Sequence, residues 1–167
     1  VAYLLAHTRH TPRDLLQLLT HVQRHANDHG VSPDQVTEGI REYAVQYFLP
    51  EVLDELAGYA DPDRIRLTMA GLAALGQREF ETTDLLEAMR QQSGTTQAVD
   101  DSLLRILFEC SALGVVRLRP GQEPAYVFRY RSREAALPPG ARMIAHPALW
   151  IALDLTLGLT DGHRSGS

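Results

Sequence analysis

The sequence predicts a mainly α protein in which a helical bundle is followed by a smaller unit with a β-hairpin. Two observations point to this class. Helix-start signals recur through the first part of the chain, whereas β-branched and aromatic residues gather in 115–133. A length of 167 residues with 44% hydrophobic content suits one or two compact units.

The helix starts are marked by a capping residue followed by proline. Thr11, Ser32 and Asp61 each precede a proline, and their side chains can accept hydrogen bonds from the free N–H groups of a first helical turn. Apolar residues recur at helical spacing behind each start. Pro50 is expected to kink or end the second of these helices, and a further helix is expected over 51–59.

The pattern changes after Gly76. Five elements are expected next, in this order: a short strand at 78–80, helices at 82–89 and 97–113, and strands at 115–119 and 125–133. This order is typical of a winged-helix domain, in which the hairpin forms the wing and the preceding helix takes the recognition position.

These elements predict four segments along the chain. They are a helical bundle over 1–60, a winged-helix domain over 61–135, a C-terminal packing segment over 136–160 with a helix at 146–157, and a disordered tail over 161–167. The predicted fold class is therefore a helical bundle followed by a winged-helix domain with a small β-hairpin wing.

The composition excludes several classes of function. The 16 basic residues are all arginine and face 21 acidic ones, so the net charge of −5 argues against indiscriminate polyanion binding. No apolar run is long enough to cross a membrane. Without a lysine the chain cannot hold a complete phosphate-binding loop, and no serine or cysteine is grouped with a base, so we expect no enzyme activity in this chain.

Cysteine and histidine give no support for a metal or redox site. Cys110 is the single cysteine, which excludes an internal disulfide, fits a cytoplasmic protein and is expected to be a core thiol. His21, His25 and His29 follow at four-residue intervals, but a zinc site needs further ligands and only Asp28 is near in sequence. We predict a solvated histidine face and no metal.

The stretch before the first long helix contains the candidate binding residues. Arg13 falls in the first helical turn, where the helix dipole disfavours a cation. Free backbone N–H groups beside an arginine make an anion site, and phosphate is the obvious ligand. The alternative is that Arg13 pairs with Asp14 or with an acid on the next helix.

Residues 8–14, Thr-Arg-His-Thr-Pro-Arg-Asp, with the Leu-Leu-Gln-Leu-Leu that follows, resemble the arginine-proline-arginine-aspartate stretch in the helical lid of bacterial STAND-like and AAA-type P-loop ATPases. In those families a winged helix often follows the lid, so the resemblance covers residues 1 to about 135 by element order. It implies a C-terminal regulatory fragment of a larger ATPase, in which Arg13 and Arg9 sense nucleotide phosphate. ATP, Mg and the ATPase core would belong to the parent protein, and no cofactor is expected in this fragment.

The hairpin supplies a second candidate surface. Its arginines alternate with apolar residues and predict one positive face, formed by Arg117, Arg119, Arg129, Arg131 and Arg133. This face can contact a nucleic-acid backbone or a protein partner, or it can pair with acids of the first unit such as Glu51, Asp54 and Glu55.

The helix before the hairpin argues against reading of the DNA major groove. Its exposed face carries Asp100, Asp101 and Glu109 against Arg105, and this negative face would be repelled by a duplex. Two alternatives to the ATPase fragment stay open. One is a free-standing winged-helix DNA-binding transcription regulator, and the other is a pure protein-interaction module.

Overall fold

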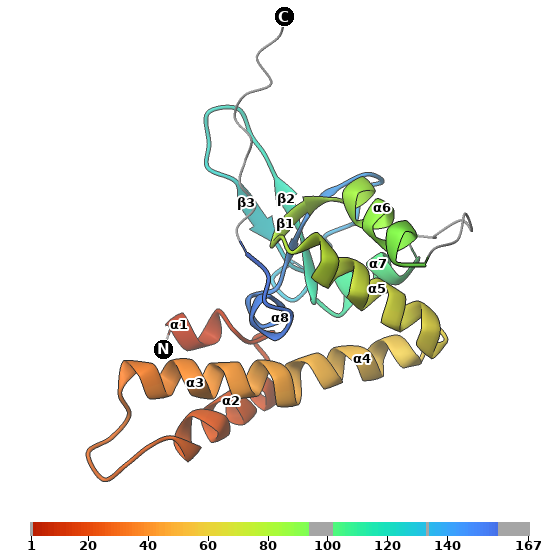
Figure 1. Cartoon of the computed structure of the whole chain (residues 1–167). Helices are drawn as coiled ribbons and strands as arrows, with labels where there is room; N and C mark the ends of the chain where they lie inside the picture. The colour runs from red at the N-terminus through yellow and green to blue at the C-terminus, as the bar shows by residue number, and fades with distance from the viewer. Residues whose placement is uncertain (1, 94–101, 133, 157–167) are drawn as a thin grey trace, which may run out of the picture.

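The computed structural model describes residues 2–93, 102–132 and 134–156. A helical first unit lies beside a second unit in which helices pack on a small antiparallel sheet (Figure 1). The predicted mainly α class with a small β portion is confirmed. Among the described helices, none combines the length and the apolar character that a membrane span requires.

The helices of the first unit begin at the predicted caps. The short α1 (Ala2–Leu5) is followed by α2 (Pro12–Arg24) and α3 (Pro33–Tyr43). The Thr11 hydroxyl accepts a first-turn N–H of α2 at 3.0 Å, and Ser32 forms a reciprocal capping box at the start of α3. Figure 1 shows α2 folded back along α3 as a helical hairpin.

The chain stays helical through Pro50, where the sequence predicted a kink or an end. A π-helical turn, η1 (Ala44–Phe48), joins α3 to α4 (Leu49–Ala57). Pro50 therefore falls in the first turn of α4, a position where its missing N–H leaves no α-helical bond unmade. The prediction that the helix ends at Pro50 is wrong, because the π-helical turn before Pro50 lets the helix continue past it.

Three helices belong to the second unit. They are α5 (Pro62–Leu75), α6 (Thr82–Ser93) and α7 (Ser102–Glu109). Asp61 caps α5 as predicted, and Gly76 ends it with a φ of 66°, a left-handed conformation that glycine adopts without strain. The first residues of the helix predicted over 97–113 lie outside the described residues.

The sheet has four strands in the order β1-β4-β2-β3. Their bounds are β1 (Glu79–Glu81), β2 (Leu113–Arg117), β3 (Ala125–Val127) and β4 (Arg142–Ala145). Met143 on β4 pairs with Phe80 on one side and with Val115 on the other. The segment predicted only to pack against the domain, 136–160, thus supplies an inner strand of the sheet.

The strand predicted over 125–133 is shorter than expected. After β3 the chain turns, because the backbone N–H groups of Arg131 and Ser132 both donate to the carbonyl oxygen of Phe128. The Ser111 hydroxyl accepts the N–H of Tyr130 at 3.0 Å and holds this turn against the end of α7. Arg129 and Arg131 therefore do not share a strand face with Arg117, the last residue of β2.

One main hydrophobic core runs through the first three of the four predicted segments. The helix α8 (Pro147–Ala152) is shorter than the predicted 146–157 and packs against η1 and α3. The core includes Leu18, Phe48, Leu72, Leu107, Met143 and Leu149. The two units are therefore joined by continuous packing. The predicted disordered tail, 161–167, lies outside the described residues.

Candidate functional site

A pocket of about 470 Å³ lies where the first unit meets the second. We call it the junction pocket. Its lining comes from the start of α2, from η1 and α4, and from the segments after α7 and β3: Arg9, Thr11, Arg13, Asp14, Tyr47, Glu51, Glu55, Glu109, Cys110, Ser111, Arg129 and Tyr130. It brings three of the predicted arginines together and places four carboxylates among them.

Arg9 is a largely buried cation that serves the fold. Its side chain is 11% exposed, and its guanidinium binds Asp14 at 3.1 Å and Glu55 at 2.9 Å. Burial alone would lower the pKa of Arg9, but the hydrogen bond and charge of Asp14, together with the charge of Glu55, outweigh burial and raise it. Asp14 is only 2% exposed, so Arg9 neutralises a buried carboxylate and fixes the start of α2.

Arg13 is exposed on the rim of the same pocket. Its side chain is 69% exposed and its Nη2 lies 2.9 Å from Glu51 Oε1 on α4. The guanidinium carbon lies 5.8 Å from the centre of the Tyr47 ring. Arg13 is thus paired with an acid, as the alternative to an anion site predicted, but the acid lies on α4 and not on the next helix, α3. Such an exposed pair contributes about 0–1 kcal/mol and can exchange with another anion.

The wing arginines separate into paired and unpaired residues. Arg129 binds Glu109 at 2.9 Å and donates a second hydrogen bond to a backbone carbonyl, whereas Arg131 lies over the Tyr130 ring. Arg117 and Arg119 are exposed and have no carboxylate within ion-pair distance in the described part of the chain. The register pairs Arg117 with an alanine of β3.

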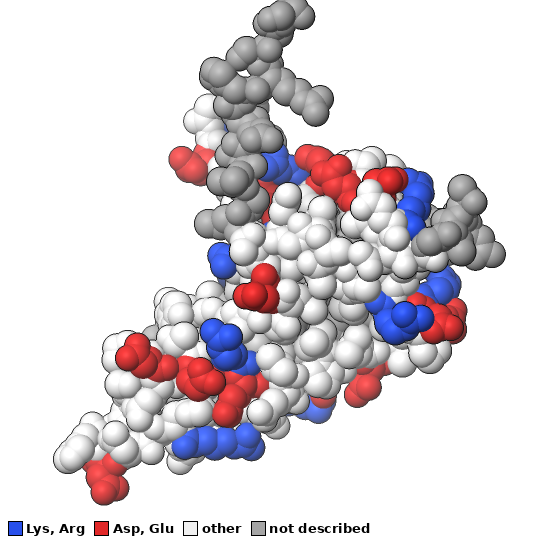
Figure 2. Space-filling model, viewed as in Figure 1, with Lys and Arg blue, Asp and Glu red and all other residues white. Residues whose placement is uncertain are grey.

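Among the described residues, the predicted continuous positive face is therefore reduced to Arg117, which ends β2, and Arg119 just after it. Arg133 lies outside the described residues. The paired wing arginine binds Glu109 of its own unit, not Glu51, Asp54 or Glu55 of the first unit. The visible face of the molecule likewise carries both signs of charge side by side (Figure 2).

His21 of α2 and His25, which caps the end of this helix, lie beside a carboxylate that the sequence did not identify. His21 Nδ1 lies 3.6 Å and His25 Nε2 lies 3.2 Å from the two oxygens of Glu42. Burial raises the pKa of Glu42, but the neighbouring His25 and His21 lower it by more. His21 is buried, so the prediction of a solvated face is wrong there.

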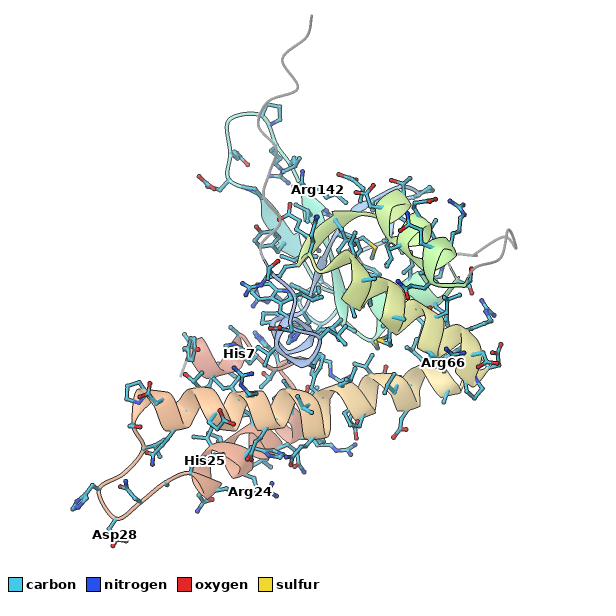
Figure 3. The ribbon with its side chains drawn as sticks, in the orientation of Figure 1. His7, Arg24, His25, Asp28, Arg66 and Arg142 are labelled. Atoms are coloured by element: carbon cyan, nitrogen blue, oxygen red, sulfur yellow. The ribbon has the colours of Figure 1, made fainter. Side chains whose placement is uncertain are left out.

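The remaining members of the histidine pattern lie elsewhere. Asp28 is at the tip of the loop between α2 and α3, away from His25 (Figure 3). Within the described ranges, no group of three or more histidine, cysteine or acidic side chains has an arrangement that could hold a metal ion. The absence of a metal stays a prediction.

Cys110 forms part of the pocket wall. Its Sγ donates to the Leu107 carbonyl at 3.4 Å, and burial raises the pKa of the thiol to about 12. The thiol is therefore protonated at neutral pH and is a poor nucleophile.

A scan against protein-family models gives no match, and searches of curated proteins and of solved structures find no similar chain. Function is therefore inferred from the junction pocket and from the resemblance of residues 8–14. Tyr47 and Glu51 are the pocket residues that contact the Arg13 guanidinium, and the resemblance does not include them. Nothing in the local sequence identifies them, because Tyr47 on η1 and Glu51 on α4 meet Arg13 only in the folded chain.

Proposed function

We propose that this chain is the C-terminal regulatory part of a larger cytoplasmic P-loop ATPase. In this proposal α1 to α4 form the helical lid, and α5 to β4 form a winged-helix domain. The chain senses the nucleotide state of the parent protein and passes it to a partner. It carries no catalytic residues of its own, and ATP, Mg and the ATPase core belong to the parent.

The exposed guanidinium of Arg13 is the observation that carries this proposal. It lies in the first turn of α2, on the rim of an open pocket, and is held by one exposed ion pair to Glu51. A guanidinium binds phosphate oxygens through two parallel hydrogen bonds, and the free N–H groups of a helix start favour the same anion.

Arg9 has a different role in the proposal. The resemblance assigns phosphate sensing to both arginines, but the Arg9 guanidinium is used inside the fold by Asp14 and Glu55. Arg9 is therefore a positioning residue, which keeps the first turn of α2 in place for Arg13.

The continuous core supports a role in transmission. α8 follows directly from β4 and packs against η1 and α3. The sheet is therefore connected through α8 to the continuous helix formed by α3, η1 and α4. A displacement of α2 on phosphate binding would move the second unit as part of the same body.

The test is the ATPase activity of the parent protein carrying Arg13→Ala. We expect weaker nucleotide binding or slower hydrolysis, because the phosphate loses a charged ligand. Arg41→Ala is the matched control, since Arg41 also forms an exposed ion pair, with Glu38 on α3, outside the junction pocket. Unchanged turnover and nucleotide affinity in the Arg13 variant would remove the sensor role.

A winged-helix DNA-binding regulator is the second candidate. Arg117, which ends β2, and Arg119 favour it, because both are exposed, have no ion-pair partner among the described residues, and can reach a nucleic-acid backbone. It requires DNA binding that weakens steeply with salt and that the double Arg117→Ala, Arg119→Ala variant loses. A pure interaction module would show neither DNA binding nor an effect of Arg13→Ala on any ATPase.

A further inference from the structure

Each guanidinium of the junction pocket is already paired with a carboxylate. Arg9 binds Asp14 and Glu55, Arg13 binds Glu51, and Arg129 binds Glu109. We propose that Glu51 is an internal competitor, which occupies Arg13 until a phosphate-class anion displaces it. This inference rests on the proposed anion site at Arg13 and adds the residue that sets its affinity.

The three pairs differ in how readily an anion can replace the carboxylate. The Arg9 guanidinium is buried and bridges two acids, so its release would leave Asp14 without a counter-charge. Arg129 is held by a backbone carbonyl as well as by a carboxylate. Only the Arg13 pair combines a largely exposed guanidinium with a single carboxylate contact.

The surroundings of Arg13 keep its guanidinium at the pocket during such an exchange. Tyr47 lies one helical turn before Glu51, and the guanidinium of Arg13 rests over its ring. The Tyr47 hydroxyl donates to the buried Asp14 at 3.4 Å, which anchors the ring. An anion that replaces the Glu51 carboxylate therefore meets a guanidinium that is already positioned.

The net charge of the junction pocket gives Glu51 a second effect on anion binding, besides its contact with Arg13. The pocket lining carries four carboxylates and three guanidiniums, so an incoming anion meets net negative charge. Neutralising Glu51 both frees Arg13 and balances the lining. Asp54, on the same helix but outside the junction pocket, provides a control for the charge effect alone.

The experiment titrates this chain with inorganic tripolyphosphate at fixed ionic strength and follows the heat of binding. We expect Glu51→Gln to bind about two- to fivefold more tightly than the wild type, the range that the energy of an exposed ion pair allows. Asp54→Asn should change the affinity less. Arg13→Ala should weaken binding, and the double Arg13→Ala, Glu51→Gln variant should not recover it. Circular dichroism verifies that each variant is folded.

Two results would overturn the inference in distinguishable ways. If Arg13→Ala weakens binding but Glu51→Gln binds no more tightly than Asp54→Asn, Glu51 is not a competitor and the Arg13 site stands. If neither the wild type nor Glu51→Gln binds, or if binding ignores Arg13, both the competitor and the anion site are wrong.

Discussion

The Nε2 atom of His146 lies 3.2 Å from the carbonyl oxygen of Thr8, a contact that links α8 to the turn before α2. The Nδ1 atom accepts the backbone N–H of Ala148 at 3.2 Å, so Nε2 carries the proton and donates it to Thr8. The ring is fully buried and stacks on Phe48 at 4.8 Å. A neutral imidazole therefore joins the two ends of the described chain.

This contact predicts that the chain loses stability in mild acid. Burial, with smaller contributions from the charges of Arg9, His7 and Arg131, lowers the pKa of His146 to about 3, although the hydrogen bond to Thr8 opposes the shift. The unfolded chain takes up a proton below its ordinary pKa of 6.5, and the folded chain does not. The free energy of unfolding should fall between those two values, by at most about 1.4 kcal/mol per pH unit from this group. Urea unfolding at several pH values measures the slope.

The His146→Phe variant separates this effect from the titration of other groups. It keeps an aromatic ring against Phe48, removes the titrating nitrogen, and should cost about 1–3 kcal/mol near neutral pH because the Thr8 carbonyl loses its donor. Its stability should vary less with pH than that of the wild type. His29→Gln, in the exposed loop, is the control and should retain the wild-type slope. Equal slopes in His146→Phe and the wild type would contradict the prediction.

Helix starts could be predicted because their cause lies within four residues. Thr11, Ser32 and Asp61 cap the helices that they were expected to cap, since each side chain bonds to the next turn of its own chain. The position of Arg13 in a first helical turn follows from the same local signal. Its partner does not, because Glu51 lies 38 residues further along and reaches Arg13 only through tertiary packing.

The errors fall where distant residues decide the local conformation. β4 is short and pairs with β1 more than 60 residues earlier, so its own composition gives little sign of a strand. The aromatic-rich segment after β3 forms a turn instead of a strand. The backbone N–H of Tyr130 donates to the Ser111 hydroxyl and not to a neighbouring strand, and the Phe128 ring packs against His146. The helix continues past Pro50 because Phe48, which is buried in the core, belongs to the π-helical turn just before the proline.

The two arginines at the start of α2 should affect stability very differently. Arg9→Ala leaves the buried Asp14 without its cation and should cost about 3–5 kcal/mol. Arg13→Ala removes an exposed pair and should cost less than about 1 kcal/mol. Urea unfolding of both variants near neutral pH measures the difference. Similar losses in the two variants would show that the buried and exposed pairs are not distinct.

Gly39 should tolerate no side chain, because α2 and α3 approach closely at this point. A Cβ at residue 39 would lie 2.5 Å from the backbone Cα of Val22, so one helix would have to move. Gly39→Ala should destabilise the chain by about 1–3 kcal/mol in thermal or urea unfolding. Gly58→Ala is the matched control, because its Cβ would meet nothing nearer than 3.5 Å and the substitution reduces unfolded-state entropy. A loss of stability at Gly58 as large as at Gly39 would contradict the packing explanation.

Cys110 should resist alkylation while the junction pocket is intact. With burial raising the pKa of its thiol to about 12, the native thiolate population near pH 8 is on the order of a thousandth of that of an ordinary exposed cysteine. Iodoacetamide labelling, followed by mass spectrometry, should be slow in the native chain and fast in concentrated urea, and the single cysteine makes the mass change unambiguous. Arg9→Ala should speed the reaction, because it destabilises the fold and so exposes the thiol more often, which outweighs the rise in thiol pKa when the Arg9 charge is lost. The distant Arg66→Ala, which removes an exposed pair with Asp63, should not. Equal labelling rates in the native and urea-unfolded chain would show that the thiol is open to solvent.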